Sequence, residues 1–142
     1  MKLIDCFMYF DEDLVLDIRL NTLKEQVDKF IIVEATKNHA GKDKKLNFKI
    51  ENFLKFKDKI HYIVIDDLPV NVNSPKKGWH ENHVRDQFQR NAIERGYKDY
   101  GDNDLIMISD IDEIPAPDKI EEFKIINKYA CFIQKNFQSK IN

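Results

Sequence analysis

The chain has 142 residues, of which 42% are hydrophobic and 34% charged, a composition that is ordinary for one soluble globular domain. Its 23 basic and 25 acidic side chains give a formal net charge of -2, which argues against a large charge-driven surface for nucleic acid or membrane. The N-terminal stretch is too short and too acidic for a signal peptide, and no later stretch approaches the ~20 apolar residues of a membrane span. We therefore expect a cytoplasmic protein with no nucleic-acid partner.

The first half of the chain is predicted to alternate strands with helices. Residues 3–10 form an apolar strand, and Asp11 and Asp13 then stand where they can cap a helix. The apolar residues that recur at helical spacing in that helix are Leu16, Leu20, Leu23 and Val27. Two further strands are predicted at 29–35 and 60–65, with a weaker helix at 51–57 between them.

The second half begins with a loop at 68–78, which contains two prolines and several Asn and Ser residues. A helix is predicted over 81–95, with Val84, Phe88 and Ala92 as its buried stripe and Gly96 as the residue that ends it. A fourth strand at 105–109, a helix starting near Asp118 and a fifth strand at 129–134 complete the chain. The two cysteines, Cys6 and Cys131, lie in apolar segments and are expected to be buried free thiols.

Short apolar strands that alternate with helices indicate a mostly parallel sheet with helices on both faces. Such sheets bind ligands outside the carboxyl ends of their strands. Acidic residues stand at three of these predicted ends, namely Glu34, the pair Asp66 and Asp67, and the pair Asp110 and Asp112. The sequence therefore predicts a binding site at that edge of the sheet.

The pattern Asp-x-Asp occurs three times, and its position distinguishes the three copies. The copy at 11–13 begins a helix, where acidic residues favour the helix dipole and need no ligand. The copy at 102–104 lies in a polar turn before a strand. Only Asp110 and Asp112 directly follow a buried strand, so this copy is the candidate site.

Two interpretations of Asp110 and Asp112 are evenly balanced on the pattern alone. A divalent ion such as Mg²⁺ or Mn²⁺ prefers oxygen ligands and is often held by one or two carboxylates together with substrate phosphates. If the strand continues, alternation places both side chains on one side, within reach of one ion. The alternative is a turn that ends the strand and whose carboxylates accept hydrogen bonds from local backbone amides.

The other polar clusters carry weaker signals. His80 and His83 have the wrong spacing for a zinc site and are better explained as a polar helix start. Arg90 is expected either to form a surface ion pair or to reach an anionic ligand. The lysines of the loop at 42–45 are expected to be solvated. Neither a P-loop nor a GxGxxG pattern occurs, which leaves nucleoside-triphosphate and dinucleotide folds without support.

Four stretches, taken in order, resemble glycosyltransferase family 17. They are IDCFMYFDEDLVLDIRLNTL (4–23), VDKFIIVEATKNHAGKDKKLNF (27–48), FQRNAIERG (88–96) and LIMISDIDEIP (105–115). The resemblance covers nearly the whole chain and implies a GT-A-like, Rossmann-like α/β domain over 1–142. It also implies a UDP-sugar donor, transfer of N-acetylglucosamine or a similar sugar to a glycan acceptor, and a divalent metal cofactor, Mn²⁺ or Mg²⁺.

The resemblance also implies roles for individual residues. Asp110 and Asp112 match the metal-binding Asp-x-Asp motif, and Glu113 lies beside it. Asp112 and Glu113 are the candidate catalytic residues, and Glu113 could equally orient the metal ligands. Glu34 and Thr36 occupy the place where such folds meet the nucleoside, and Arg90 and Asn91 match a helix beside the donor. A general base for the acceptor hydroxyl is not identified.

Members of the family continue well beyond the Asp-x-Asp segment, whereas this chain has about thirty residues after it. We therefore expect an incomplete sheet that lacks most of the acceptor half. An exposed sheet edge would then favour self-association or a companion chain. One alternative function is a truncated, inactive or split donor-binding remnant. A less favoured alternative is a phosphatase of the haloacid-dehalogenase type, in which an Asp-x-Asp pair follows the first strand and Thr or Val stands where this chain has Ile114.

Overall fold

The structure is a computed structural model that describes residues 1–72, 79–123 and 129–134. Its strands are β1 (Leu3–Met8), β2 (Lys29–Ala35), β3 (Ile60–Ile65) and β4 (Leu105–Ile108). Its helices are α1 (Asp13–Leu23), the 3-10 helix η1 (Ile50–Phe56), α2 (Trp79–Asn91), α3 (Glu94–Tyr97) and α4 (Pro117–Glu121). Among the described helices, none has the length and apolar character needed to cross a bilayer.

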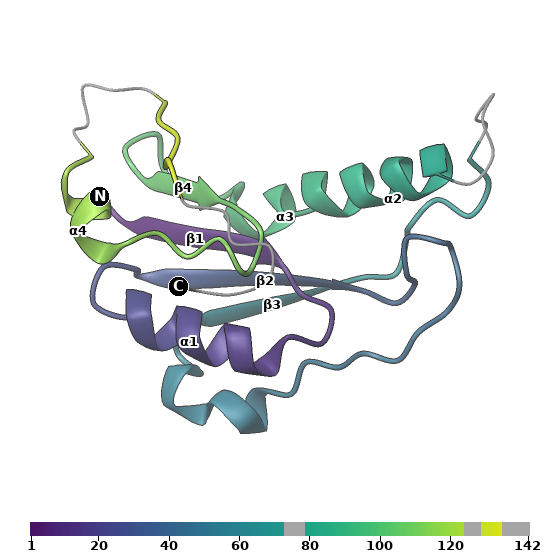
Figure 1. The fold of residues 1–142 in the computed structure, drawn as a ribbon, viewed down its shortest axis with the longest axis horizontal. Helices are drawn as coiled ribbons and strands as arrows, with labels where there is room; N and C mark the ends of the chain where they lie inside the picture. Colours follow the sequence, from purple (N-terminus) through teal and green to yellow (C-terminus); the bar gives the residue numbers. More distant parts are fainter. Residues whose placement is uncertain (73–78, 124–128, 135–142) are drawn as a thin grey trace.

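The four strands form one sheet in the order β3-β2-β1-β4, and every neighbouring pair is parallel (Figure 1). The chain moves outward from β1 through β2 to β3 and then crosses back to place β4 on the other side of β1. The order of the strands therefore reverses between β1 and β4, and the carboxyl ends of these two strands flank a topological switch point. The predicted α/β class with a parallel sheet is confirmed.

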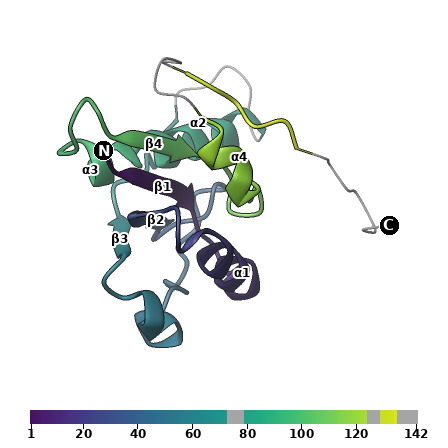
Figure 2. The same ribbon diagram turned by 90° about the vertical axis from the view of Figure 1, so that its left-hand side faces the viewer.

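Both faces of the sheet are covered, because successive strand side chains point to opposite sides. On one face Phe30 and Ile32 pack with the apolar side chains of α1 and η1. On the other face Ile31 and Val33 pack with the junction of α2 and α3. Figures 1 and 2 show α1 and η1 on one side of the sheet and α2 and α3 on the other. This two-sided burial explains why the strands read as continuous apolar runs.

The start and end of α1 differ from the prediction. Neither Asp11 nor Asp13 caps the helix; its N-cap is Glu12, which makes no side-chain cap. The Glu12 carboxylate instead accepts the backbone N–H groups of Phe10 and Asp11, and Asp13 accepts the Tyr9 hydroxyl. The helix ends at Leu23, before Val27, although Val27 is still buried in the core.

The single helix predicted over 81–95 is divided into α2 and α3. Gly96 does not end a helix but lies inside α3, without a positive φ angle. A Cβ atom on Gly96 would lie 2.5 Å from Ile31 Cγ2 and 2.9 Å from Ile63 Cδ1. The glycine therefore serves close packing of α3 on the sheet.

Two expectations for the C-terminal part are wrong. Residues 129–134 form no strand, and Figure 2 shows them as an extended yellow segment on the side of the sheet where β4 and α4 lie. A strand needs a paired neighbour, and in the described part of the chain none pairs with this segment. Cys131 is consequently exposed, whereas Cys6 is buried as expected. The predicted loop has no helix or strand at 68–72, and its remainder, 73–78, lies outside the described residues.

Candidate functional site

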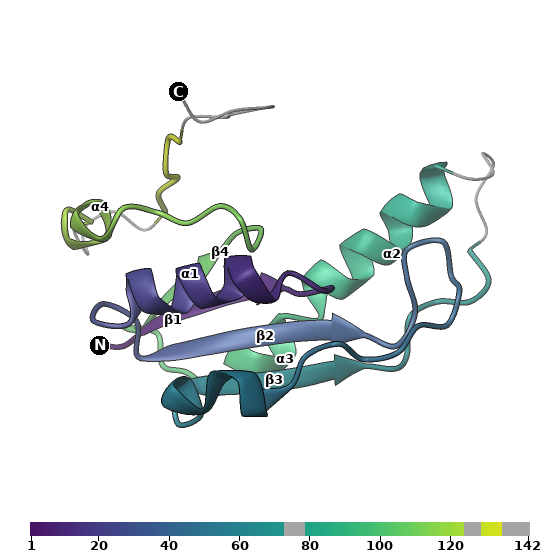
Figure 3. The same cartoon turned by 60° about the horizontal axis from the view of Figure 1, so that its bottom comes forward.

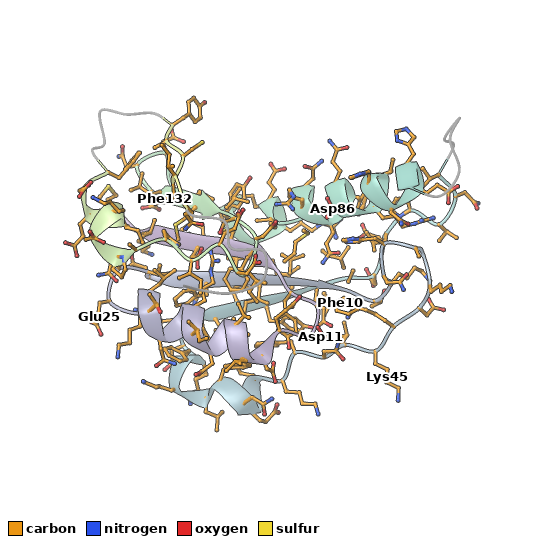
Figure 4. All side chains as sticks on the ribbon, in the orientation of Figure 1. Phe10, Asp11, Glu25, Lys45, Asp86 and Phe132 are labelled. Atoms are coloured by element: carbon orange, nitrogen blue, oxygen red, sulfur yellow. The ribbon has the colours of Figure 1, made fainter. Side chains whose placement is uncertain are left out.

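A cleft of about 430 Å³ opens at the carboxyl ends of the strands. Figure 3 shows the arrowheads of β2 and β3 at the end of the sheet where α2 and the loop after β2 lie. Figure 4 shows Phe10, which follows β1, below Asp86 of α2 at that end. The lining residues are Met8, Tyr9, Phe10, Glu12, Val15, Lys37, Asn38, His39, Lys44, Asp86, Gln89, Arg90, Asp110, Ile111 and Asp112. The cleft therefore lies at the switch point, where a sheet of this topology presents its ligands.

Asp110 and Asp112 reach the cleft from a turn and not from a strand. Strand β4 ends at Ile108, so the condition for alternation, a strand that continues through 110–112, is not met. The turn is closed by the Glu113 N–H, which donates to the Asp110 carbonyl oxygen at 3.0 Å. In return, Glu113 Oε2 accepts the Asp110 N–H at 3.1 Å. Ile111 is buried while both aspartates are exposed and line the cleft.

Arg90 of α2 meets this turn directly. Its Nη2 lies 2.8 Å from Asp110 Oδ1, and both side chains are about half exposed. A pair this exposed contributes little to stability, so its partners can exchange for a ligand at small cost. Of the predicted site residues, the structure thus brings Arg90, Asp110 and Asp112 together at one cleft.

The lining carries charges of both signs. Carboxylates come from Glu12, Asp86, Asp110 and Asp112, and cationic groups from Lys37, Lys44 and Arg90. Each cation has a carboxylate partner: Asp43 for Lys37, Glu34 for Lys44 and Asp110 for Arg90. His39 Nε2 lies 3.1 Å from Gln89 Oε1 and so links the loop after β2 to α2.

The donor set at the turn fits a hard divalent cation that is shared with a ligand. Among the described residues, no three His, Cys, Asp or Glu side chains come together as a complete metal site. Two carboxylates with an open cleft beside them match the habit of Mg²⁺ and Mn²⁺, which take one or two protein oxygens and leave the remainder to water and phosphate.

Glu34 does not line the cleft but lies in the interior, with none of its surface exposed. Its Oε1 accepts the Asn47 N–H at 2.8 Å and an N–H of Lys44, while Oε2 accepts the Phe48 N–H at 3.1 Å and the Tyr62 hydroxyl at 2.8 Å. Burial and the hydrogen bond to Glu34 raise the pKa of the Tyr62 hydroxyl, which keeps it a donor. The Glu34 carboxylate thus stabilises the loop after β2. The expectation of a solvated lysine is wrong for Lys44, because its ammonium group donates to this carboxylate.

The remaining predicted residues also lie outside the lining. Thr36 is half-buried, and its Oγ1 is 3.4 Å from the Ile65 carbonyl oxygen. Asn91 is exposed on α2, one residue beyond Arg90. The Glu113 carboxylate is engaged in closing the turn beside the cleft.

Sequence reasoning missed an ion pair beneath the turn, between Asp5 of β1 and Arg19 of α1. Both side chains are fully buried. Burial raises the pKa of the Asp5 carboxyl, and the hydrogen bonds and charge of Arg19 oppose that shift. Two signals were available: an aspartate inside an apolar strand, and an arginine on the buried stripe of a helix, between Leu16 and Leu20. Charged residues are seldom fully buried unless they are paired.

Comparison with protein families matches residues 1–140 to "Glycosyltransferase family 17". Among curated proteins, the chain is similar to the human beta-1,4-mannosyl-glycoprotein 4-beta-N-acetylglucosaminyltransferase, with 27% identity over 121 residues. It is equally similar to the rat protein of the same name, at 27% identity. In both cases the match covers 82% of this chain and 22% of the relative, so the chain corresponds to about a fifth of each relative's length. No solved structure matches the chain.

Proposed function

The chain belongs to glycosyltransferase family 17, and we propose that it binds a UDP-sugar and a divalent cation for transfer of the sugar to a glycan acceptor. The names of the relatives favour N-acetylglucosamine as the sugar. The observation that carries the proposal is the cleft at the switch point, where Asp110, Asp112 and Arg90 face one space. Acidic and cationic groups side by side suit a metal-diphosphate ligand.

In this proposal Asp110 and Asp112 hold the cation, Mn²⁺ or Mg²⁺. When bound, the cation would stabilise the negative charge that develops on the departing diphosphate. Asp110 already faces a positive charge at 2.8 Å, that of Arg90, which supports its ability to accept a cation. Arg90 is then free to donate to a phosphate oxygen, for which its planar fork is well suited.

The other predicted residues have supporting parts. Glu113 keeps the turn closed next to Asp112 through its contact with the Asp110 N–H. Glu34 fixes the loop that supplies Lys37, Asn38 and His39 to the cleft wall, so we propose that it acts on the donor site through that loop. Thr36 stands at the start of the same loop, and Asn91 follows Arg90 at the end of α2.

A second candidate function is donor binding without turnover. It stays an alternative because the match covers 22% of the relatives' length, so the match alone does not carry their named activity over to this stretch. A haloacid-dehalogenase-type phosphatase has less support, since the Asp-x-Asp pair follows β4 and not β1. Comparing UDP-sugar binding with release of UDP in the presence and absence of an acceptor glycan separates these functions.

The test is calorimetric titration of UDP-N-acetylglucosamine into the protein with MnCl₂. We expect binding that is lost with a chelator and weakened at least about ten-fold in Asp110→Asn and Asp112→Asn, because each variant removes a carboxylate charge at constant shape. Equal affinity of wild type and Asp112→Asn would refute the metal site.

The matched control is Asp102→Asn. Asp102 belongs to the Asp-x-Asp copy at 102–104, which has the same spacing but lies outside the cleft lining. We expect this variant to bind the donor with wild-type affinity. A comparable loss in Asp102→Asn would mean that the effect reflects net charge and not the site.

A further inference from the structure

The buried pair of Asp5 and Arg19 has an arrangement that packing alone does not require. Arg19 Nε donates to Asp5 Oδ2 at 2.8 Å, and Nη2 donates to Oδ1 at 2.7 Å, so the contact is bidentate. Both side chains have no exposed surface, and the guanidinium also lies 4.6 Å from the centre of the Phe7 ring. The aspartate thus fixes both the charge and the orientation of the arginine.

The rest of the guanidinium faces the turn that carries Asp110 and Asp112. Nη1 donates to the carbonyl oxygens of Asp110 at 2.8 Å, Ile111 at 3.0 Å and Glu113 at 3.2 Å. Nη2 donates to Ser109 Oγ at 2.6 Å. One side chain from α1 therefore binds three carbonyl groups and one hydroxyl of the turn.

Energetics favour a role for this pair other than stability. The desolvation of two buried charges often cancels their attraction, and apolar side chains of similar volume commonly stabilise a fold as well or better. A leucine on the stripe between Leu16 and Leu20 would fill the same helix face. An apolar residue, however, would remove the arginine donor from all three carbonyl oxygens. Asp110 would keep the Glu113 N–H and Glu113 the Ser109 hydroxyl, whereas the Ile111 carbonyl oxygen would lose its described donor.

We propose that Arg19, held by Asp5, is a positioning residue that sets the conformation of the turn at 109–113 and so directs Asp110 and Asp112 into the cleft. Three carbonyl groups and the Ile111 side chain face inward, and the two aspartate side chains consequently face outward. The effect on the ligand rests on the proposed function; the effect on the turn does not. A lysine cannot replace the arginine, because an ammonium is a single point and cannot serve the carboxylate and the carbonyl groups together.

The test uses two variants of the whole chain. Asp5→Leu with Arg19→Met removes both charges at similar volume, and Arg19→Lys keeps a positive charge opposite Asp5. The matched control is Asp67→Asn with Arg95→Met, which removes a bidentate pair of the same kind, with N–O distances of 2.7 and 2.9 Å, at an exposed position. Each protein is first checked for cooperative unfolding, and those that fold are compared.

The first readout is hydrogen exchange of the backbone amides at 110–114 without metal or nucleotide. We expect exchange at least about ten-fold faster than in wild type, while the amides of β2 keep their rates. Unchanged exchange at the turn in a folded variant would overturn the proposal, and so would equal acceleration in the surface-pair control. If the double variant does not fold, the exchange rates of Arg19→Lys at 110–114 are compared with wild type and judged by the same two criteria.

The second readout is Mn²⁺-dependent binding of UDP. We expect a loss of about ten- to a hundred-fold in the folded variants, the range for residues that orient metal ligands. Faster exchange with full Mn²⁺-dependent affinity would overturn the effect on the ligand. If wild type binds no UDP, the proposed function fails, whereas the exchange measurement still decides on the turn.

Discussion

At the scale of single residues, the loop after β2 depends on the buried carboxylate of Glu34. Its two oxygens accept hydrogen bonds from Lys44, from the amides of Asn47 and Phe48, and from the Tyr62 hydroxyl. In Glu34→Gln one oxygen becomes an NH₂ group that faces these donors. We expect a loss of about 3 kcal/mol in the free energy of unfolding, measured with urea.

Tyr62→Phe is the matched control for Glu34→Gln, because it removes one neutral donor from the same carboxylate. It should cost only about 1 kcal/mol. If Glu34 contacted the nucleoside directly, Glu34→Gln would instead lower UDP affinity at nearly unchanged stability. That result would indicate that Glu34 contacts the donor directly, and it would contradict the role of Glu34 in holding the loop after β2.

The surface pair of Asp67 and Arg95 gives a small dependence of stability on pH. The hydrogen bonds from Arg95 lower the pKa of the Asp67 carboxyl below its unfolded value of about 3.9. The contribution of this ion pair to the free energy of unfolding is therefore complete above the unfolded pKa of Asp67. It is lost as the pH falls through the lower pKa of the folded state. Because both side chains are about half exposed, we expect less than about 1 kcal/mol.

Urea unfolding of wild type and Asp67→Asn at neutral pH and near pH 3 tests this expectation. The variant should be slightly less stable at neutral pH, and the difference should shrink in acid. A difference that grows as the pH falls would contradict the assigned direction of the shift.

At the scale of the elements, Gly96 decides how closely α3 packs on the sheet. In Gly96→Ala the new methyl group would lie 2.5 Å from Ile31 Cγ2, an atom on a branched side chain in the centre of β2. Overpacking of this kind costs about 1–3 kcal/mol, whereas alanine gains ~1 kcal/mol over glycine in a helix. We expect a net loss of up to about 2 kcal/mol in the free energy of unfolding.

Gly101→Ala is the matched control for Gly96→Ala. The nearest atom to its new Cβ is Asp104 Oδ2 at 3.8 Å, which is an ordinary contact. Thermal unfolding should place this variant within about 0.5 kcal/mol of wild type. A Gly96→Ala variant as stable as wild type would show that α3 and Ile31 can move apart without a cost in stability.

The central strands β1 and β2 were predictable because they are buried on both faces and therefore appear as apolar runs, as in the FIIVEA segment of β2. The break between α2 and α3 could not be predicted, because Ala92 and Ile93 suit a continuous helix. The interruption depends on how these residues pack against the sheet. The strand predicted at 129–134 was wrong because local sequence preference was not enough. Its residues favour a strand, but a strand also requires a partner.

At the scale of the whole molecule, the place of the site was predictable and its construction was not. Parallel topology assigns ligands to the carboxyl ends of strands, and Asp110 and Asp112 do line the cleft there. The contact of Arg90 with Asp110 depends on how α2 crosses the sheet, which sequence spacing does not specify. The same holds for Arg19, whose partners are up to 94 residues away in the chain.

The sheet also has two outer edges, and their difference predicts how copies of the chain associate. In the described part of the chain, no strand pairs with the outer side of β3 or of β4. Ile108 at the end of β4 is 47% exposed. Ile133, which lines a shallow hollow together with Ile114 and Pro115 of the segment after β4, is fully exposed. Unpaired backbone groups beside exposed apolar side chains favour strand addition.

We therefore predict concentration-dependent self-association through the β4 side, measured by sedimentation velocity. Ile108→Lys should weaken it, because a charge on an edge strand opposes pairing with a second strand. Val64→Lys places the same charge on the β3 edge, at a side chain that is 38% exposed, and should leave association unchanged. A monomer at every concentration would contradict the prediction. Weakening by Val64→Lys alone would assign the contact to the β3 edge.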